Sequence, residues 1–384
     1  MAEKVLQFAQ PDITAAEINA VMEVMQSGWL TTGPKAAQFE SDLVAYLGGR
    51  LHAVAVNSAT AGLHLALEGI GLGPGDEVIT TTLTFTATAE VVRYLGADPV
   101  FVDVDAHTLN MRPDCVAAAM SPRTKAIIPV HFAGLACDMD DILEIASRGG
   151  VAVLEDAAHA LPASYRETPV GQFASRATVF SFYANKTMTT GEGGMVITRD
   201  AELATRMRTM RLHGINRDAF DRFTSTSPAW FYEVVAPGFK YNLTDIAAAI
   251  GIEQLKRLDG MAAQRNALAE RYFEKLESLP LILPARPRGQ DQHAWHLFVV
   301  RLSDHTEHGR DDVIRELSAR GIGTSVHYTP LHRHPYWRER YGLQAESFPE
   351  AERAYLRMIT LPLYSRMTEA DVDRVAAALR EVLA

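Results

Sequence analysis

Cysteine is scarce in this sequence. Cys115 and Cys137 are the only two in 384 residues, and they form no CxxC pair. A disulfide framework and a cysteine-rich zinc site are therefore excluded, and we interpret both cysteines as packing residues. The 13 histidines are scattered without an HExxH or similar zinc signature, so the sequence predicts no metal site.

Long apolar runs and excess positive charge are also missing. No apolar run reaches the roughly 18 residues of a membrane span, and the opening stretch MAEKVLQFAQPDITAAEINAV lacks the apolar core of a signal peptide. We therefore expect a cytoplasmic protein with no membrane partner. The net charge of -10 and the pI near 5.7 argue against a nucleic-acid partner. Any anionic substrate must then be held by local donors.

What the chain does contain is the composition of an ordinary globular protein, with 47% hydrophobic and 22% charged residues. From about residue 52 to 200, short β-branched runs alternate with amphipathic segments, which predicts an α/β fold with a mostly parallel or mixed sheet between two helix layers. Long helical patterns follow, and HAWHLFVVRL and GTSVHY are predicted strands of a smaller α/β domain. We expect a large domain over residues 1–250 and a small domain over 251–384.

Ends of predicted strands carry the candidate functional groups, because ligands collect at the carboxyl ends of parallel strands. After HAVAVN, the stretch SATAG would open a helix whose free N–H groups, near Thr60 and Ala61, can bind a phosphate. It is also an ordinary N-cap. Asp156 ends the buried run VAVLED, where a carboxylate needs a cation or hydrogen bonds. From that stretch alone, an aspartate that caps the next helix is an equally good interpretation.

Two further strand ends complete the set. Phe85, in TTTLTFTAT, could cover a bound ring, although such a phenylalanine is more often core. Lys186 follows the strand-like ATVFS in FSFYANKTMTTGEGG, where a surface lysine is the ordinary interpretation. Together, an anion cradle, a carboxylate, a stacking ring and an amine are what a pyridoxal phosphate site requires. The joint pattern favours that cofactor far more than any one stretch does.

Four stretches, NSATAGLHLAL, VAVLEDAAHA, FSFYANKTMTTGEGG and PGFKYNLTDIAAAIG, resemble in that order the motifs of the DegT/DnrJ/EryC1/StrS sugar-nucleotide aminotransferases. The likeness runs essentially end to end. It implies the fold of fold-type I pyridoxal phosphate (PLP) enzymes, with a large mixed-sheet three-layer domain. It also implies a homodimer with both active sites at the subunit interface.

The resemblance assigns roles residue by residue. Lys186 would be the lysine that forms a Schiff base with the cofactor, and Asp156 would partner the protonated ring nitrogen. Contacts to the cofactor are also implied for Thr60, Ala61 and Ser181 at its phosphate, Phe85 on the ring, His159 near the phenolic oxygen, and Asn242 at the phosphate of the other subunit's cofactor. Substrate contacts are implied for Trp29, Thr31, Lys240, His327 and Tyr328. His296, at the start of an apolar run, is predicted to be a packing residue.

Within the family, SGWLTTGPK, RTKAIIPVHFAG, KYNLTDI, HAWHLFVVR and RGIGTSVH look most like the UDP-4-amino-4-deoxy-L-arabinose:oxoglutarate aminotransferases. Two departures leave the sugar open. Phe85 stands where those enzymes have a tryptophan, and HYTPLHRHPYW, which is expected to approach the sugar, follows the general family pattern. Nearby, Arg333, Arg338 and Arg340 could meet a diphosphate or form a solvated face.

The function implied by the resemblance is amino transfer from glutamate, which leaves as 2-oxoglutarate, to the 4-keto carbon of a nucleotide-linked sugar. The sugar would be a UDP-4-keto-pentose or a 4-keto-6-deoxyhexose, for polysaccharide or lipopolysaccharide biosynthesis. Amination at carbon 3 is an alternative, and a PLP-binding regulator without turnover is another. The related 3-dehydratases carry histidine in place of Lys186, so dehydration is disfavoured.

Overall fold

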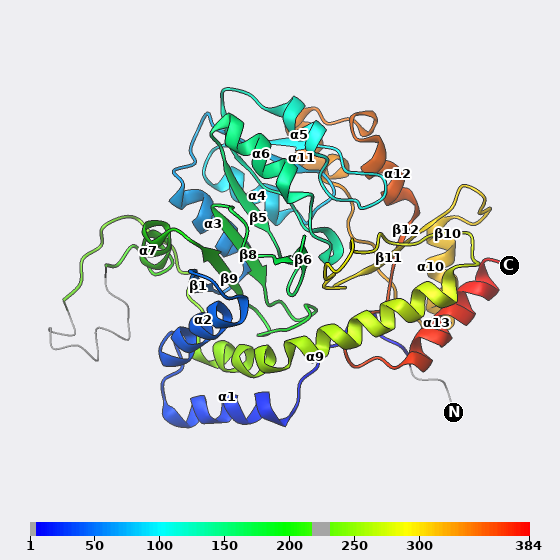
Figure 1. Ribbon diagram of the computed structural model, residues 1–384, viewed down its shortest axis with the longest axis horizontal. Coiled ribbons are helices and arrows are strands. Elements are labelled where there is room, and N and C mark those ends of the chain that lie inside the picture. Colours follow the sequence, from blue (N-terminus) through cyan, green and yellow to red (C-terminus); the bar gives the residue numbers. More distant parts are fainter. Residues whose placement is uncertain (1–4, 217–230) are drawn as a thin grey trace.

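The computed structural model describes residues 5–216 and 231–384. A central mixed sheet of seven strands runs in the order β1-β9-β8-β5-β4-β2-β3 (Figure 1). Every neighbouring pair is parallel except the two pairs that β9 makes. The strands are β1 (His52–Val56), β2 (Glu77–Thr81), β3 (Asp98–Val102), β4 (Thr124–Ile127), β5 (Ala152–Asp156), β8 (Ala177–Ser181) and β9 (Gly194–Thr198).

Successive side chains of each central strand point to opposite faces of the sheet and pack in two different cores. These strands are therefore nearly continuous apolar runs in the sequence. In β1, Ala53 and Ala55 pack on one face, and Val54 and Val56 pack on the other. One face is covered by α2 (Pro34–Leu47), α5 (Pro113–Ala119), α6 (Met139–Gly149) and the first half of α9 (Asp245–Leu276). The other is covered by α3 (Ala59–Gly69), α4 (Ala87–Tyr94) and α7 (Ala201–Met210). The predicted three-layer α/β fold is confirmed.

The C-terminal part forms a second core around an antiparallel sheet, in which β11 (Phe298–Leu302) lies between β10 (Leu281–Ile282) and β12 (Met358–Leu361). Helices α10 (Arg310–Ala319), α13 (Glu369–Val382) and the second half of α9 cover it. Leu6 also packs in this core and forms an isolated bridge with Ile322, so the segment around Leu6 lies with the C-terminal part. The smaller elements are α1 (Ala15–Ser27), α11 (Pro335–Tyr341), α12 (Pro349–Arg357), the hairpin of β6 (Ser164–Tyr165) and β7 (Thr168–Pro169), and the 3-10 turns η1 (Phe132–Gly134), η2 (Leu331–Arg333) and η3 (Ala345–Ser347).

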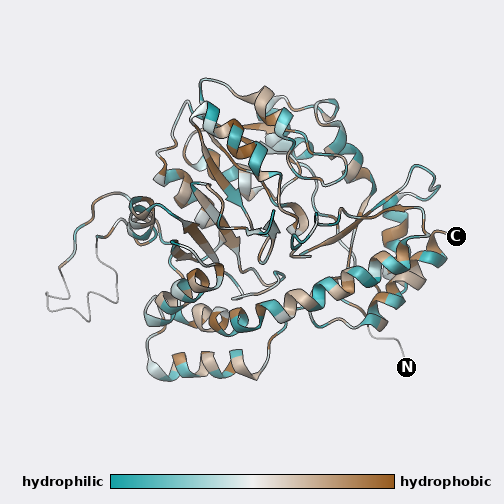
Figure 2. Cartoon of the chain, in the orientation of Figure 1, coloured by the Kyte–Doolittle hydropathy of each residue, from teal (hydrophilic) through white to brown (hydrophobic). Residues whose placement is uncertain are grey.

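Helix α9 joins the two parts without a break. Figure 1 shows it running along one side of the molecule from the large sheet to the small one, with α1 on its outer side. The domain boundary expected at residue 250 therefore falls inside a continuous helix of 32 residues. Figure 2 shows the strands of the large sheet mostly brown, whereas the helices carry teal segments on their outer faces. The hydrophobic surface is thus concentrated between the layers.

Two strand predictions need correction. GTSVHY forms no strand; it contributes one isolated bridge, from Ser325 to Thr360, and Ile322 just before it bridges to Leu6. HAWHLFVVRL becomes a strand only from Phe298 onward. Before that point Trp295 has a positive φ of 44°, and the backbone binds the η1 turn through Ala294 and Leu297 rather than a neighbouring strand. Apolar periodicity cannot distinguish such a pinned loop from a strand.

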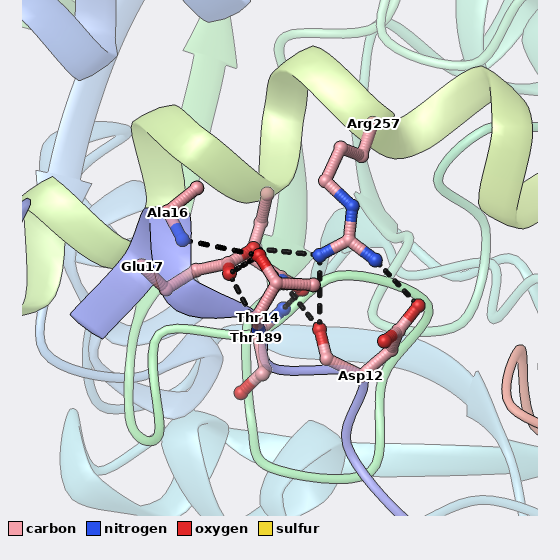
Figure 3. A network of polar contacts seen from close by, with 7 residues as sticks. Asp12, Thr14, Ala16, Glu17, Thr189 and Arg257 are labelled. Carbon is pink, nitrogen blue, oxygen red and sulfur yellow. Dashed lines mark hydrogen bonds and ion pairs between the residues drawn. The ribbon is translucent and has the colours of Figure 1, made fainter. Parts of the chain in front are cut away.

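A polar network ties α1 to α9 and to the loop that contains Lys186 (Figure 3). The Glu17 carboxylate is buried and accepts hydrogen bonds from Thr14, Gln254 and Arg257. Gln254 in turn accepts from the backbone N–H of Thr189, three residues after Lys186. Burial raises the pKa of Glu17, but the hydrogen bonds from Thr14 and Gln254 outweigh that effect and lower the pKa to about 2. The network thus anchors the lysine loop to two helices.

Within the described ranges, 5–216 and 231–384, no helix is long and apolar enough to cross a membrane. The same ranges hold no group of three or more histidine, cysteine, aspartate or glutamate residues placed to bind a metal ion. Both cysteines are free; Cys137 is buried and Cys115 is partly buried against the same core.

We predict that Glu17→Gln lowers the free energy of unfolding at pH 7 by about 2–3 kcal/mol, because the buried network loses its negative charge and one of its two acceptor oxygens. The folded-state pKa lies below the ordinary value of 4.5, so this stabilisation is complete above about pH 4.5. It is lost as the pH falls toward 2. Urea unfolding should show that the difference in the free energy of unfolding between the variant and the parent becomes smaller as the pH is lowered from 7. The control is Glu23→Gln, an exposed position on the same helix; an equal loss there would contradict the prediction.

Candidate active site

A cavity of about 420 Å³ lies at the carboxyl ends of the parallel strands β1, β2, β5 and β8. Strand β9 runs the other way, so its first residues reach the same edge. Chain from the C-terminal part closes the cavity opposite the sheet. Most of the residues predicted from the sequence line it: Thr60, Phe85, Asp156, His159, Ser181, Lys186, His327 and Tyr328.

The start of α3 forms one wall of the cavity. Ser58 is its N-cap, and its hydroxyl accepts the hydrogen bond of the Ala61 N–H. The Ala61 N–H is thus already used, and Ala61 itself is buried behind this wall. The N–H groups at the first two helical positions, Ala59 and Thr60, have no acceptor within the helix. Gly194 allows β9 to lie directly against this turn, since a Cβ there would come within 2.7 Å of the Ala59 nitrogen. A compact anion cradle results.

Two neighbouring carboxylates at the end of β5 have different surroundings. Glu155 is fully buried and is bonded to His131 Nε2 at 2.8 Å and to the Thr178 hydroxyl at 2.6 Å. Asp156 lies on the opposite face and accepts hydrogen bonds from the Thr88 hydroxyl at 2.8 Å and from the Ala158 N–H at 3.1 Å. Among the described residues, no cation lies within ion-pair distance of it. Burial raises the pKa of Asp156, and the hydrogen bonds and the more distant charges of Lys186 and His131 offset this effect only in part.

Aromatic and imidazole rings line the cavity opposite the cradle. Phe85 is 58% exposed, and its ring lies 5.8 Å from that of Tyr328. The Tyr328 hydroxyl is 2.9 Å from His159 Nε2. Burial raises the pKa of Tyr328 and lowers that of His159 well below 6.5, so the phenol donates to a neutral imidazole. The remaining hydrogen of His159 then sits on Nδ1, which is buried and has no partner among the described residues.

Lys186 lies in the turn after β8, where its backbone N–H donates to the Tyr183 carbonyl. Its amine lies 3.3 Å from His296 Nε2. Burial lowers the pKa of Lys186 to about 8, with Asp156 opposing that change and the Arg265 guanidinium adding to it. At pH 7 roughly a tenth of this amine is then uncharged and able to act as a nucleophile or base, far more than for an ordinary lysine.

The other predicted residues form a second group outside the cavity. Asn242 pairs with Val56 at the end of β1, accepts a hydrogen bond from the Lys240 amine at 2.6 Å and donates to the Thr32 hydroxyl at 2.7 Å. Trp29 and Thr31 lie in the same loop as Thr32, which approaches the start of α9. Lys240 and Thr31 are exposed. Within one chain, none of these four side chains lines the cavity.

A second cavity of about 910 Å³ adjoins the first and shares Thr84, Phe85 and Tyr328 with it. Its outer wall comes from α4 and from the HYTPLHRHPYW segment, including His334, Tyr336 and Trp337. The three arginines of that region do not line it. Arg333 is paired with Glu352, and Arg338 and Arg340 are exposed at the end of α11.

Sequence reasoning missed His296 and Thr88. His296 was predicted to be packing, but the structure places it against the Lys186 amine. Thr88 holds the Asp156 carboxylate from α4, a helix 68 residues away in the sequence. No local pattern marks either residue, although the unusual pair of histidines in HAWH is a signal that could have raised the question.

These residues fit pyridoxal phosphate. The cradle at the start of α3 suits a phosphate, and the unpaired Asp156 carboxylate suits a protonated ring nitrogen. The unpartnered Nδ1–H of His159 suits an acceptor oxygen on the ring. Phe85 offers an exposed ring face, and Lys186 offers the amine.

Comparison with known proteins gives a consistent picture. The spore coat polysaccharide biosynthesis protein SpsC of Bacillus subtilis is 46% identical over 98% of this chain and 97% of its own length. Among solved structures, the aminotransferase TlmJ of Streptoalloteichus hindustanus superposes with a TM-score of 0.89 at 35% identity, covering 98% of each chain. Helicobacter pylori PseC, an aminotransferase of pseudoaminic acid biosynthesis, gives a TM-score of 0.91 at 29% identity, covering 99% of each chain.

Spr1654 of Streptococcus pneumoniae, named as a candidate sugar aminotransferase, has been solved in a PLP form. It gives a TM-score of 0.91 at 32% identity, covering 99% of this chain and 100% of its own. The model of the DegT/DnrJ/EryC1/StrS aminotransferase family matches residues 11–380. On the strength of that match and of the 46% identity to SpsC, the chain belongs to the DegT/DnrJ/EryC1/StrS aminotransferase family.

Proposed function

We propose that the protein is a PLP-dependent aminotransferase that moves an amino group from glutamate to the 4-keto carbon of a nucleotide-linked sugar. The observation that carries the proposal is the Lys186 amine on the wall of a cavity that also contains an anion cradle and a buried carboxylate without a cation. Membership of the family already implies amino transfer to a sugar. Our proposal adds the amino donor, the sugar carbon that accepts the amino group and the link to a nucleotide.

Bound pyridoxal phosphate supplies an aldehyde that exchanges amino groups and a ring that delocalises negative charge. Asp156 holds a proton at the ring nitrogen, because a buried carboxylate gains a cationic partner there. Ser58, Thr60 and Ser181 line the cavity and would hold the phosphate, and Phe85 would cover the ring. Lys186 Nζ moves the proton at the substrate carbon, for which a pKa of about 8 suits a base working near neutral pH.

The nucleotide-linked sugar is proposed to enter through the adjoining cavity. Tyr328 and Phe85 stand at its junction with the first cavity, so a sugar placed beside Lys186 would extend its nucleotide past these two rings. His327 and Tyr328 then contact the sugar. SpsC is named for spore coat polysaccharide biosynthesis and PseC for pseudoaminic acid biosynthesis, which supports a role in making amino sugars for surface polysaccharides. The proposal includes both a pentose and a 6-deoxyhexose as the sugar of the substrate.

A homodimer with shared active sites accounts for the second residue group. The outer side of α1 exposes Ile18, Met22 and Met25, an apolar strip at helical spacing that a partner would cover. Asn242 and Lys240 lie outside the cavity of their own chain. In the proposed dimer, Asn242 reaches the cofactor phosphate of the other subunit, and Trp29, Thr31 and Lys240 reach its substrate.

A competing function is a PLP-binding regulator without turnover. It would need no base on the cavity wall, yet the Lys186 amine is present there with a lowered pKa. Dehydration is disfavoured for the same reason, because it is carried out in the family branch that has histidine at this position. Transamination therefore remains the proposal.

The colour of the purified protein provides the first test. With pyridoxal phosphate bound, we expect a visible absorption band that moves to the ultraviolet on adding glutamate, and we expect Lys186→Ala to lose at least about 10³-fold in activity with loss of the nucleophile. The matched control is Lys125→Ala at an exposed position on β4, which should retain parent activity. A spectrum that glutamate leaves unchanged would refute transamination.

The substrate proposal is tested by an amino-transfer assay with glutamate against UDP-, dTDP- and GDP-linked 4-keto sugars, pentoses and 6-deoxyhexoses alike. We expect one of them to exceed the others by about 10²-fold or more in kcat/KM, because a cavity with fixed polar groups discriminates strongly. The corresponding 3-keto sugars form the comparison set. Activity restricted to 3-keto sugars would overturn the carbon-4 proposal and leave the aminotransferase class intact.

Sharing of active sites is tested by complementation. Lys186→Ala and Asn242→Ala homodimers should each be impaired, the second through weaker cofactor binding. Mixed dimers formed by co-expression should recover about a quarter of parent activity, because half of the dimers are mixed and each contains one site with both residues intact. If Asn242 serves the site of its own chain, no mixed dimer has an intact site, and activity would not exceed the average of the two homodimers.

A further inference from the structure

We propose that His296 is a positioning residue for the Lys186 amine, with its Nε2 accepting a hydrogen bond that fixes the amine on one side of the cavity. The inference rests on the proposed role of Lys186 and extends it to a residue outside the predicted site. Its basis is the 3.3 Å contact between Lys186 Nζ and His296 Nε2. His296 is itself 4% exposed, so this is an interior contact rather than a surface encounter.

The backbone beside His296 is held unusually firmly. The Trp295 N–H donates to His293 Nδ1 at 2.8 Å, its carbonyl accepts from the buried Arg265 guanidinium at 3.0 Å, and its indole N–H donates to Asn266 at 3.1 Å. Trp295 adopts a φ of 44°, a left-handed conformation that is unfavourable for a residue with a side chain. Every polar group of Trp295 is thus used to hold a backbone shape that the local sequence disfavours.

A second restraint comes from the η1 turn. The Ala294 N–H donates to the Gly134 carbonyl at 3.0 Å, and the Leu297 N–H donates to the Ala133 carbonyl at 3.2 Å. Gly134 has a φ of 103°, and a Cβ there would come within 3.1 Å of the Trp295 nitrogen. Close approach of the two segments therefore requires glycine. The turn of chain that presents His296 to Lys186 is fixed from both sides.

The His296 ring has few other uses. It packs against the His159 ring, with centroids 4.4 Å apart at 46°, and its Nδ1 is buried without a hydrogen-bond partner among the described residues. Buried polar atoms are normally paired, so an imidazole with one unpaired nitrogen needs a reason to be there. A residue serving only to fill space would be apolar. The contact that remains is the one with the Lys186 amine.

The charges around the pair keep His296 neutral. Burial lowers its pKa well below 6.5, and the cationic forms of Lys186, His159, Arg265 and His327 act in the same direction. Asp156 is the anion that faces Lys186, and Arg265 is the other cation that acts on it. A neutral imidazole with its hydrogen on Nδ1 has an acceptor at Nε2 for the amine. The lone pair of the uncharged amine then points away from His296 and into the cavity.

The test uses cofactor-free protein and measures the rate at which acetic anhydride modifies Lys186 between about pH 6 and 11, followed by peptide mass spectrometry. An acceptor favours the charged amine, so its removal in His296→Phe, which keeps an aromatic ring, should lower the apparent pKa of Lys186 by about one pH unit. His296→Gln, whose amide oxygen accepts, should restore most of the parent value. His296→Leu is the second acceptor-free variant and carries the test if the phenylalanine does not fit.

The matched control is His64→Phe. His64 is equally buried and burial lowers its pKa, but it packs against Tyr94, Phe239 and Tyr241 and belongs neither to the His296 segment nor to the cavity wall. We expect the pKa of Lys186 to stay at its parent value in this variant. An unchanged pKa in both acceptor-free variants, or an equal fall in His64→Phe, would overturn the proposal. Neither result depends on which sugar is the substrate.

Loaded enzyme gives an independent readout. In His296→Phe, the glutamate half-reaction should slow roughly tenfold, and its isotope effect with 2-deuterated glutamate should rise, because proton transfer by a poorly placed amine becomes more rate-limiting. The Kd for pyridoxal phosphate should change less than about threefold. A lowered rate with an unchanged isotope effect, accompanied by an equal loss of cofactor affinity, would indicate a structural role and contradict positioning.

Discussion

A buried carboxylate at the end of β5, with no cation of the described residues within ion-pair distance, is the constraint on which the rest of the site depends. Glu155, one residue earlier, has its own partners in His131 and Thr178, whereas Asp156 accepts hydrogen bonds from a hydroxyl and one N–H. An unpaired charge in the interior is costly, and the protonated nitrogen of a bound ring relieves that cost. A cofactor held at Asp156 and at the α3 cradle would lie in the cavity that Lys186 and Phe85 also line.

The scaffold delivers these groups through sheet topology. Parallel strands bring the residues that follow β1, β2, β5 and β8 to one edge, although they are separated by more than a hundred positions in the chain. His327 and Tyr328, in the chain between β11 and β12, close the other side. The loop with Lys186 is anchored through Thr189 and Gln254 to Glu17, and the facing loop with His296 is anchored by Arg265. Both walls of the cavity are thus tied to α9, the helix that joins the two parts of the molecule.

Much of this arrangement could be predicted from the sequence, and the reasons are physical. Strands that are buried on both faces are apolar runs in the sequence, and polar residues directly after them must lie at the sheet edge. For that reason the positions of Asp156, Lys186 and the SATAG turn could be predicted. Other features had no local signal. HAWH looked like the start of a strand because it leads directly into the apolar run LFVV, whereas the backbone around Trp295 is held by Arg265 and by the bonds of Ala294 and Leu297 to the η1 turn. Thr88 and His296 acquire their partners only through folding.

By itself, the sequence determined the fold class and the chemistry, because both follow from the order of residue types along single strands and turns. Tertiary structure decided the surroundings of those residues. In the part of the chain that the structure describes, it left Asp156 with no cation within ion-pair distance, brought His296 to the Lys186 amine, and separated the Asn242 group from the cavity of its own chain. These outcomes depend on which distant segments meet and on how much water is excluded between them. No local pattern encodes either quantity, because burial and pairing are properties of the packed interior.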